Sequence, residues 1–325
     1  MAAVPVQMCR ALALAVTVVV LALSVLPEAS GYGVKEFLAD YKNPKVSRIE
    51  VKGDVYLTSN LPELSRNVTI VGVGKKRPVI DGQNKYSGIV TDYVLSVRNL
   101  EFRNLVTTRF RGGAAILSFG DNNKFENCVF RNNRAFGSGD SGDGGAINFY
   151  SNTWRITNCQ FIANRASQTG GALYALGESS GKLTGSTFTN NYAKDRGGAV
   201  ALIGSFATID KCAFQGNQAD GDVGGAVSCS RSGCYISRNS FRNNVVNGTG
   251  GALRFYSDDE GGYGVLCKGN TFSGNRAADS STNNLHIVVQ DTVKSWSFCA
   301  KAPSGTKVDA PSSAIEYGNC RRCPK

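Results

Sequence analysis

Three aspartates of this chain lie at one kind of turn, just ahead of a glycine pair. Asp143 directly precedes a Gly-Gly, and Asp195 and Asp222 each lie two residues before one. Stacked carboxylates could hold Ca²⁺, which prefers several oxygen ligands, or they could contact a carbohydrate. Because arginines such as Arg196 lie close by in sequence, we favour turn carboxylates paired with arginine. We therefore expect no metal site and no cofactor, with Ca²⁺ as the alternative.

No other pattern in the sequence predicts catalysis. The chain has one histidine, His286, and a catalytic triad would need a nucleophile beside it. Its neighbours Leu285 and Ile287 are apolar, which favours a place in a terminal strand. A glycoside hydrolase needs two carboxylates at a set separation, and no such set is recognisable. We therefore assign no catalytic residue.

Five of the ten cysteines fall in the middle of the chain. Cys128, Cys159 and Cys212 each lie two residues before a recurring phenylalanine, which predicts a column of buried thiols. Cys229 and Cys234 flank a short Ser-Arg-Ser-Gly turn and are candidates for a disulfide.

Three further cysteines, Cys299, Cys320 and Cys323, lie near the C-terminus. A disulfide among them would fasten a cap over the end of the domain, as expected in an oxidising compartment. The spacing of Cys320 and Cys323 also occurs in zinc and redox sites, but a lone CxxC is a weak indication of either.

Two short motifs alternate along most of the chain. One motif is Gly-Gly-Ala, which starts at Gly112, Gly144, Gly170, Gly197, Gly224 and Gly250. The other is Phe-x-x-Asn, with its phenylalanine at Phe130, Phe161, Phe188, Phe214, Phe241 and Phe272. Most copies return after 26 or 27 residues. A fixed period of this length indicates a stacked repeat architecture.

Within each repeat, apolar residues alternate with other residues at a period of two, which is typical of half-buried strands. Gly-Gly suits a tight corner that needs positive φ, and stacked Asn side chains can hydrogen-bond along the axis. Helical repeats of similar length are excluded by the many glycines and asparagines. We predict an all-β fold, a right-handed single-stranded parallel β-helix of about nine coils, with the six phenylalanines stacked inward.

The same alternation gives finer predictions. It places Ala115 and Leu117 on the inward face of the strand that follows the first Gly-Gly-Ala. It places Cys267 at the inward position of a second strand, five residues before Phe272. Two insertions, 137–143 and 258–260, interrupt the period and are expected to bulge outward without changing the coils.

The ends of the chain differ from the repeats. Residues 11–26 are apolar or small and are followed by Ala29-Ser30-Gly31, which predicts a secretory signal peptide over 1–31. We expect a β-helix domain with an N-terminal cap over 32–298, and a Cys-containing tail or cap over 299–325. Asn67 and Asn247 begin N-glycosylation sequons. The expected location is therefore secreted, extracellular or at the cell surface, with no membrane span after cleavage.

The chain is basic, with a net charge of +11 at pH 7. Removal of residues 1–31 takes away one Arg and one Glu and leaves this charge unchanged. A basic surface favours acidic partners. Because secretion disfavours nucleic acid, we expect an anionic polysaccharide or another component of the cell surface or matrix.

The paired Gly-Gly-Ala and Phe-x-x-Asn motifs resemble the repeats of the chlamydial polymorphic outer membrane proteins and of related β-helix proteins with the pectin lyase-like fold. The resemblance covers roughly residues 99–277 and implies a surface or secreted β-helix whose usual role is adhesion. We therefore expect a non-enzymatic protein that binds extracellular or cell-wall polymers. The alternative is a polysaccharide lyase or glycoside hydrolase on the same fold.

Overall fold

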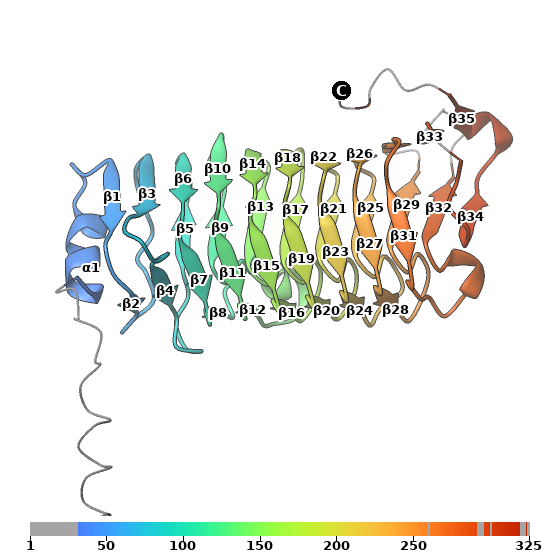
Figure 1. The fold of residues 1–325 in the computed structure, drawn as a ribbon. Coiled ribbons are helices and arrows are strands. Elements are labelled where there is room, and N and C mark those ends of the chain that lie inside the picture. The colour runs from blue at the N-terminus through green and yellow to red at the C-terminus, as the bar shows by residue number, and fades with distance from the viewer. Residues whose placement is uncertain (1–31, 259–260, 291–295, 300, 319–322, 324–325) are drawn as a thin grey trace, which may run out of the picture.

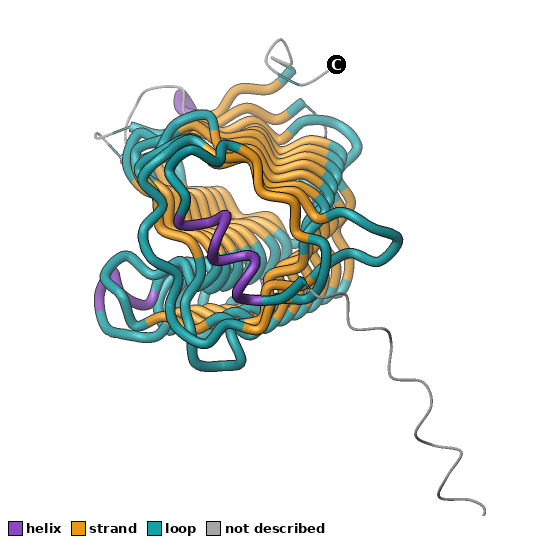
Figure 2. The backbone as a smooth tube through the Cα atoms, turned by 90° about the vertical axis from the view of Figure 1, so that its left-hand side faces the viewer, coloured by secondary structure: helices purple, strands orange, loops and turns teal. Residues whose placement is uncertain are grey.

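The computed structural model describes residues 32–258, 261–290, 296–299, 301–318 and 323. The predicted signal peptide over 1–31 therefore lies outside the described residues. In the described part, short parallel strands stack side by side along one axis (Figure 1) and enclose a continuous interior (Figure 2). The predicted right-handed parallel β-helix is confirmed.

The strands form four parallel sheets, which we name A to D. Sheet A contains β1 (Arg48–Val51), β3 (Val68–Gly72), β6 (Leu95–Arg98), β10 (Asn123–Glu126), β14 (Thr153–Thr157), β18 (Ser180–Thr184), β22 (Phe206–Asp210), β26 (Gly233–Ser237), β30 (Tyr263–Leu266), β33 (Trp296–Phe298) and β35 (Ile315–Tyr317). Sheet B contains β2 (Val55–Tyr56), β4 (Val79–Asp81), β7 (Glu101–Arg103), β11 (Val129–Arg131), β15 (Gln160–Ile162), β19 (Thr187–Thr189), β23 (Ala213–Gln215), β27 (Ser240–Arg242) and β31 (Thr271–Ser273).

The other two sheets complete each coil. Sheet C contains β5 (Ile89–Thr91), β9 (Ile116–Ser118), β13 (Ile147–Tyr150), β17 (Leu173–Leu176), β21 (Val200–Ile203), β25 (Val227–Ser230), β29 (Leu253–Ser257), β32 (Leu285–Val289) and β34 (Thr306–Asp309). Sheet D contains β8 (Val106–Thr107), β12 (Arg134–Ala135), β16 (Arg165–Ala166), β20 (Tyr192–Ala193), β24 (Gln218–Ala219) and β28 (Val245–Val246). A full coil passes through sheets C, A, B and D in that order.

The predicted phenylalanine column runs through the interior. Ring planes in neighbouring coils are nearly parallel, and the column starts one coil earlier than the motif predicts, at Phe102. From Phe130 to Phe241 the side chains are fully buried. Their stacking fills part of the interior and holds the coils in register.

An asparagine ladder lies directly beside this column. Asn164 illustrates the pattern: its Nδ2 donates to Asn191 Oδ1 at 2.9 Å and to the Phe130 carbonyl at 3.0 Å. Its Oδ1 accepts from the backbone and side-chain nitrogens of Asn133. Because both polar atoms of the buried amide are satisfied within the column, each coil is fastened to the next. The predicted ladder is confirmed.

The corners of each coil need unusual backbone conformations. The residue three positions before the phenylalanine has positive φ in successive coils, for example 53° at Asn158 and 54° at Lys211. At the Gly-Gly corner Gly170 has φ of +67°, and a Cβ on Gly171 would lie 2.1 Å from the Gly198 carbonyl oxygen. Only glycine allows the backbones of neighbouring coils to approach this closely.

Two of the finer predictions are wrong, each by one residue. Ile116, not Ala115, pairs with the inward Ile147, so Leu117 faces outward beside Asn148. In the last repeats Leu266, not Cys267, pairs with the inward Ile236. One added residue reverses the side-chain direction in a strand, and both coils carry such an addition.

Both ends of the solenoid are covered. Helix α1 (Val34–Lys42) lies across the open N-terminal end (Figure 2) and buries Phe37 and Tyr41 against the first coil. At the other end, β34 and β35 extend sheets C and A beyond residue 298, where we expected the β-helix to end. The short 3₁₀ helix η2 (Ser280–Thr282) lies between β31 and β32, and η3 (Ser312–Ala314) lies between β34 and β35.

The first insertion leaves the coils unchanged, as predicted. Phe130 still pairs with Phe161 and Ile147 with Leu173 on either side of it. The inserted loop contains the 3₁₀ helix η1 (Gly139–Gly142), and its flanking residues Gly137 and Ser138 are exposed. Of the second insertion, residues 259–260 lie outside the described residues.

Candidate functional site

The three aspartates predicted to share a turn are not brought together as one cluster. Asp195 and Asp222 occupy one position in neighbouring coils, because Arg196 pairs with Val223. Asp143 occupies the position of Arg196 two coils earlier and is buried, where its Oδ1 accepts from the Thr169 backbone at 2.9 Å.

Two of the three aspartates, Asp143 and Asp195, have protein partners. Asp195 forms an ion pair of 2.9 Å with Arg196. Among the described residues, no group of three or more His, Cys, Asp or Glu side chains could hold a metal ion. The geometry of Asp143 and Asp195 therefore matches turn carboxylates paired with protein donors, and Ca²⁺ binding stays an untested alternative.

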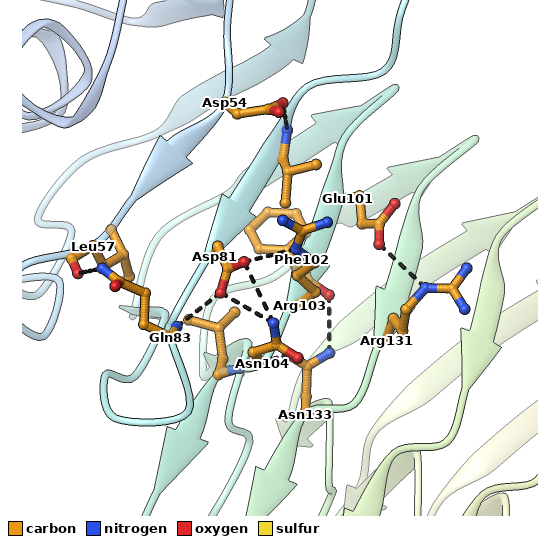
Figure 3. Close-up of polar contacts among 12 residues, drawn as sticks. Asp54, Leu57, Asp81, Gln83, Glu101, Phe102, Arg103, Asn104, Arg131 and Asn133 are labelled. Atoms are coloured by element: carbon orange, nitrogen blue, oxygen red, sulfur yellow. Dashed lines mark hydrogen bonds and ion pairs between the residues drawn. The ribbon is translucent and has the colours of Figure 1, made fainter. Parts of the chain in front are cut away.

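The most deeply buried carboxylate of the N-terminal coils is structural. Asp81 lies at the centre of a hydrogen-bond network (Figure 3). Its oxygens accept from Arg103 Nε at 2.7 Å, from the Gln83 backbone at 2.8 Å and from Asn104 Nδ2. Because these donors already occupy Asp81, it fixes the turn after β4 and offers nothing to a substrate.

His286 lies in β32, as its apolar neighbours predict, but on the outward side of sheet C. Its Nε2 is 2.8 Å from Asp309 Oδ2. Burial lowers the pKa of His286 more than Asp309 raises it. The ring therefore holds β34 against β32, and no nucleophilic side chain contacts it within the described residues.

The cysteines of the described residues include both buried thiols and disulfides. Cys128, Cys159 and Cys212 are buried thiols in one column. Cys229 and Cys234 form a disulfide. A second disulfide joins Cys267 to Cys323 and fastens the tail to the last coils, and Cys299 Sγ lies 3.5 Å from Cys323 Sγ. Cys320 lies outside the described residues.

The outer face of sheet A carries a charge pattern that the sequence analysis missed. Lys124, Arg155 and Lys182 pair directly with one another on β10, β14 and β18. All three side chains point outward and are exposed. None of them forms an ion pair within the described part of the chain. We call these three residues the basic stripe.

The basic stripe borders a shallow groove of about 310 Å³. Hydroxyl and amide side chains form much of the remaining lining, with contributions from Asn122, Thr153, Ser180 and Thr208. Beneath this face, Gly181 pairs with the inward Trp154, and a Cβ there would lie 2.0 Å from the Trp154 ring, so the glycine makes room for the indole in the interior. A groove of this kind offers cations and hydrogen-bonding groups but no paired carboxylates.

Aromatic side chains continue this face toward the C-terminus. Phe206 lies 5.2 Å from Tyr235 and 6.1 Å from Tyr263, measured between ring centroids. Phe206 also lines the groove. Aromatic edges and faces provide flat apolar area beside polar tips, which suits a ligand with both apolar and polar surfaces.

Neighbouring strands in a sheet lie ~4.8 Å apart, so the backbones of the basic stripe repeat at this interval along the axis. Like charges in register on one face repel each other. The repulsion is relieved when an anionic partner lies along the stripe. A signal for this stripe was present in the sequence, because each of its residues lies six positions before a recurring phenylalanine.

Residues 66–293 match the family described as a right-handed beta helix region, and the chain belongs to this family. No curated protein matches the chain, and neither does any solved structure. Among the described residues, no helix is long and apolar enough to cross a membrane. The family identifies the architecture, so function has to be argued from the faces of this particular solenoid.

Proposed function

We propose that this protein is secreted or displayed at a cell surface, and that it binds an acidic extracellular polysaccharide along the outer face of sheet A without cleaving it. The observation that carries the proposal is the basic stripe: three exposed cations in register on consecutive coils, beside a groove lined by hydroxyl and amide groups. The net charge of +11 adds a long-range attraction for such a polymer.

A polysaccharide fits this face better than a compact anion does. A sugar chain lying along the axis would present charges repeatedly, and the stripe presents cations repeatedly. Each contact is weak in water, but several contacts on one rigid face act together. The resemblance of the repeats to polymorphic outer membrane proteins, whose usual role is adhesion, supports the same conclusion.

The non-enzymatic part of the proposal rests on what lines the groove. Hydrolysis of a glycosidic bond needs an acid and a second carboxylate, and the residues that line the groove include no Asp or Glu. A polysaccharide lyase or glycoside hydrolase remains the alternative function, and release of products tests it directly.

The test uses the mature chain with polygalacturonate, alginate and a neutral glucan. We expect binding to the two acidic polymers that weakens as salt is raised, since the Debye length falls to ~10 Å at 0.1 M. The variant Lys124→Gln/Arg155→Gln/Lys182→Gln should lose most of this binding. The control variant Lys35→Gln/Lys42→Gln/Lys85→Gln removes the same charge from exposed positions elsewhere and should bind nearly as well as the original protein.

Two results would contradict the proposal. Equal loss of binding in both triple variants would show that net charge, not the basic stripe, drives association. Release of unsaturated or reducing ends from any polymer would show that the protein is an enzyme.

A further inference from the structure

Arg254, like Arg77 and Arg109, has a guanidinium nitrogen that is shielded from solvent without a hydrogen-bond partner, and we consider it here because it lies on the outer face of sheet C. It lies in β29 between the inward residues Leu253 and Phe255, so its side chain faces out from sheet C. The guanidinium is largely buried, and its Nε is shielded from solvent without any acceptor. Within the described part of the chain, Arg254 makes no side-chain hydrogen bond or ion pair.

Two other outward arginines of the solenoid are paired with buried aspartates. Arg103 contacts Asp81 at 2.7 Å, and Arg238 contacts Asp210 at 2.8 Å. Each of these arginines lies on the outside of a coil, and each has a carboxylate from a nearby coil as its partner. Arg254 is partly buried but has no carboxylate partner, and this is unfavourable for a charged group.

The groups around Arg254 disfavour its positive charge rather than neutralise it. Burial lowers the pKa of Arg254, and the neighbouring charge of Arg196 lowers it as well, against weaker opposing effects of Tyr256 and Asp222. Asp195 already forms an ion pair with Arg196. The nearest carboxylates therefore leave the Arg254 guanidinium without a hydrogen-bonded counter-ion.

The next coil does not supply a counter-ion either. His286 pairs in register with Arg254, and its Nδ1 is also buried without a partner. The carboxylate of Asp309 contacts His286 Nε2 at 2.8 Å and Lys307 Nζ at 3.4 Å. Two residues that pair in register on sheet C thus each have a buried nitrogen without a partner. A bound oxyanion would satisfy the guanidinium.

We propose that Arg254 anchors a subsite for a single carboxylate of an acidic sugar on the outer face of sheet C, with Arg196 at its edge. The proposal deepens the proposed function, because it assumes that the bound polymer carries carboxylates. A guanidinium matches a carboxylate with two parallel hydrogen bonds. The ring of Tyr256, 5.3 Å from the guanidinium, provides an apolar wall for the sugar ring.

The test separates this subsite from the basic stripe by ligand size. The probe is glucuronate monosaccharide, followed by NMR, because one sugar cannot bridge several coils. The matched control is the methyl ester of glucuronate, which has the same ring without the charge. We expect glucuronate to bind the mature protein and the ester to bind at least tenfold more weakly, since hydrogen bonds to charged groups contribute more than neutral ones.

The second part of the experiment measures glucuronate binding by variants of Arg254. Arg254→Gln should weaken glucuronate binding by about tenfold to a hundredfold, and Arg254→Lys should weaken it less but measurably, because lysine lacks the planar fork. The melting temperature of Arg254→Gln should stay equal or rise, because an unpaired buried charge is removed. A purely structural arginine would instead lower it and leave glucuronate binding unchanged.

The outcomes for the two faces are distinguishable. The subsite is overturned if glucuronate binds equally to the original protein and to Arg254→Gln, or if it binds to neither. Neither result bears on polymer binding by the basic stripe, which has its own test. The variant Lys124→Gln/Arg155→Gln/Lys182→Gln should bind glucuronate normally even where it loses the polymer. If Arg254→Gln fails to fold, Arg254→Lys retains the charge and still decides the question.

Discussion

The rings of Phe161 and Phe188 lie 4.6 Å apart, centroid to centroid, with only 2° between their planes. The two residues come from neighbouring coils and pair directly in sheet B. Because both are fully buried, their contact is part of the packing that holds one coil on the next. A phenylalanine is therefore required at the same position in each of these coils.

Truncation in this column should be strongly destabilising. We expect Phe188→Ala to lower the free energy of unfolding by ~3–5 kcal/mol, because a large side chain is removed from a close-packed column and leaves a cavity. Urea denaturation followed by circular dichroism measures the change. Phe136→Ala is the control, since Phe136 is 36% exposed. A loss of similar size in both variants would contradict the role of the stack.

Recurring residues made this part of the fold predictable. A phenylalanine or asparagine that returns at each coil must occupy one place in every coil, so its column can be read from the sequence. Leu117 and Cys267 were misplaced because each coil holds one extra residue, and a shift of one reverses the face. The sequence shows that a coil is longer, but not where the extra residue is accommodated.

Of the two candidate sites, one could be predicted from the sequence and the other could not. The basic stripe recurs at one position of the repeat and could have been found from the sequence. Arg254 could not, because its position is occupied by Asn148, Tyr174, Ala201 and Ser228 in earlier coils. Its distinguishing property is the lack of a counter-ion, and that depends on residues from several coils.

Calcium should not affect the stability of the fold. Asp143 and Asp195 have protein partners, and no candidate metal cluster exists among the described residues. We expect the melting temperature in a thermal-shift assay to be the same with excess Ca²⁺ and with EDTA. A rise with Ca²⁺ that is abolished by Asp195→Asn would restore the metal site at this turn.

The His286–Asp309 pair predicts a pH dependence. The folded-state pKa of His286 is lowered from 6.5, chiefly by burial, so the unfolded chain binds a proton more readily than the folded one. Stability from this group is therefore present above pH 6.5 and is lost as the pH falls below it. The pKa of Asp309 is also lowered, chiefly by its hydrogen bond to His286, and its contribution is lost only at more acidic pH, below 3.8.

The measurement compares melting temperatures between pH 7.5 and 5. We expect the original protein to lose stability over this range and His286→Gln to change less, because His286 is the one histidine in the sequence. A control variant, Asp309→Asn, keeps the histidine but removes the carboxylate that raises its pKa, so its loss of stability toward pH 5 should be at least as steep. Identical slopes in the original protein and in His286→Gln would show that the ring titrates normally.

The two disulfides should differ in how much they stabilise the protein. Cys267 and Cys323 are separated by 56 residues, and Cys229 and Cys234 by 5. Closing the longer loop removes more entropy from the unfolded chain, so its loss should be worth ~4 kcal/mol against ~2 kcal/mol for the shorter one. The variants Cys267→Ala/Cys323→Ala and Cys229→Ala/Cys234→Ala, compared by urea denaturation, measure both values. If the shorter loop proved the more important, packing around Cys229 and Cys234 in the interior, rather than chain entropy, would dominate.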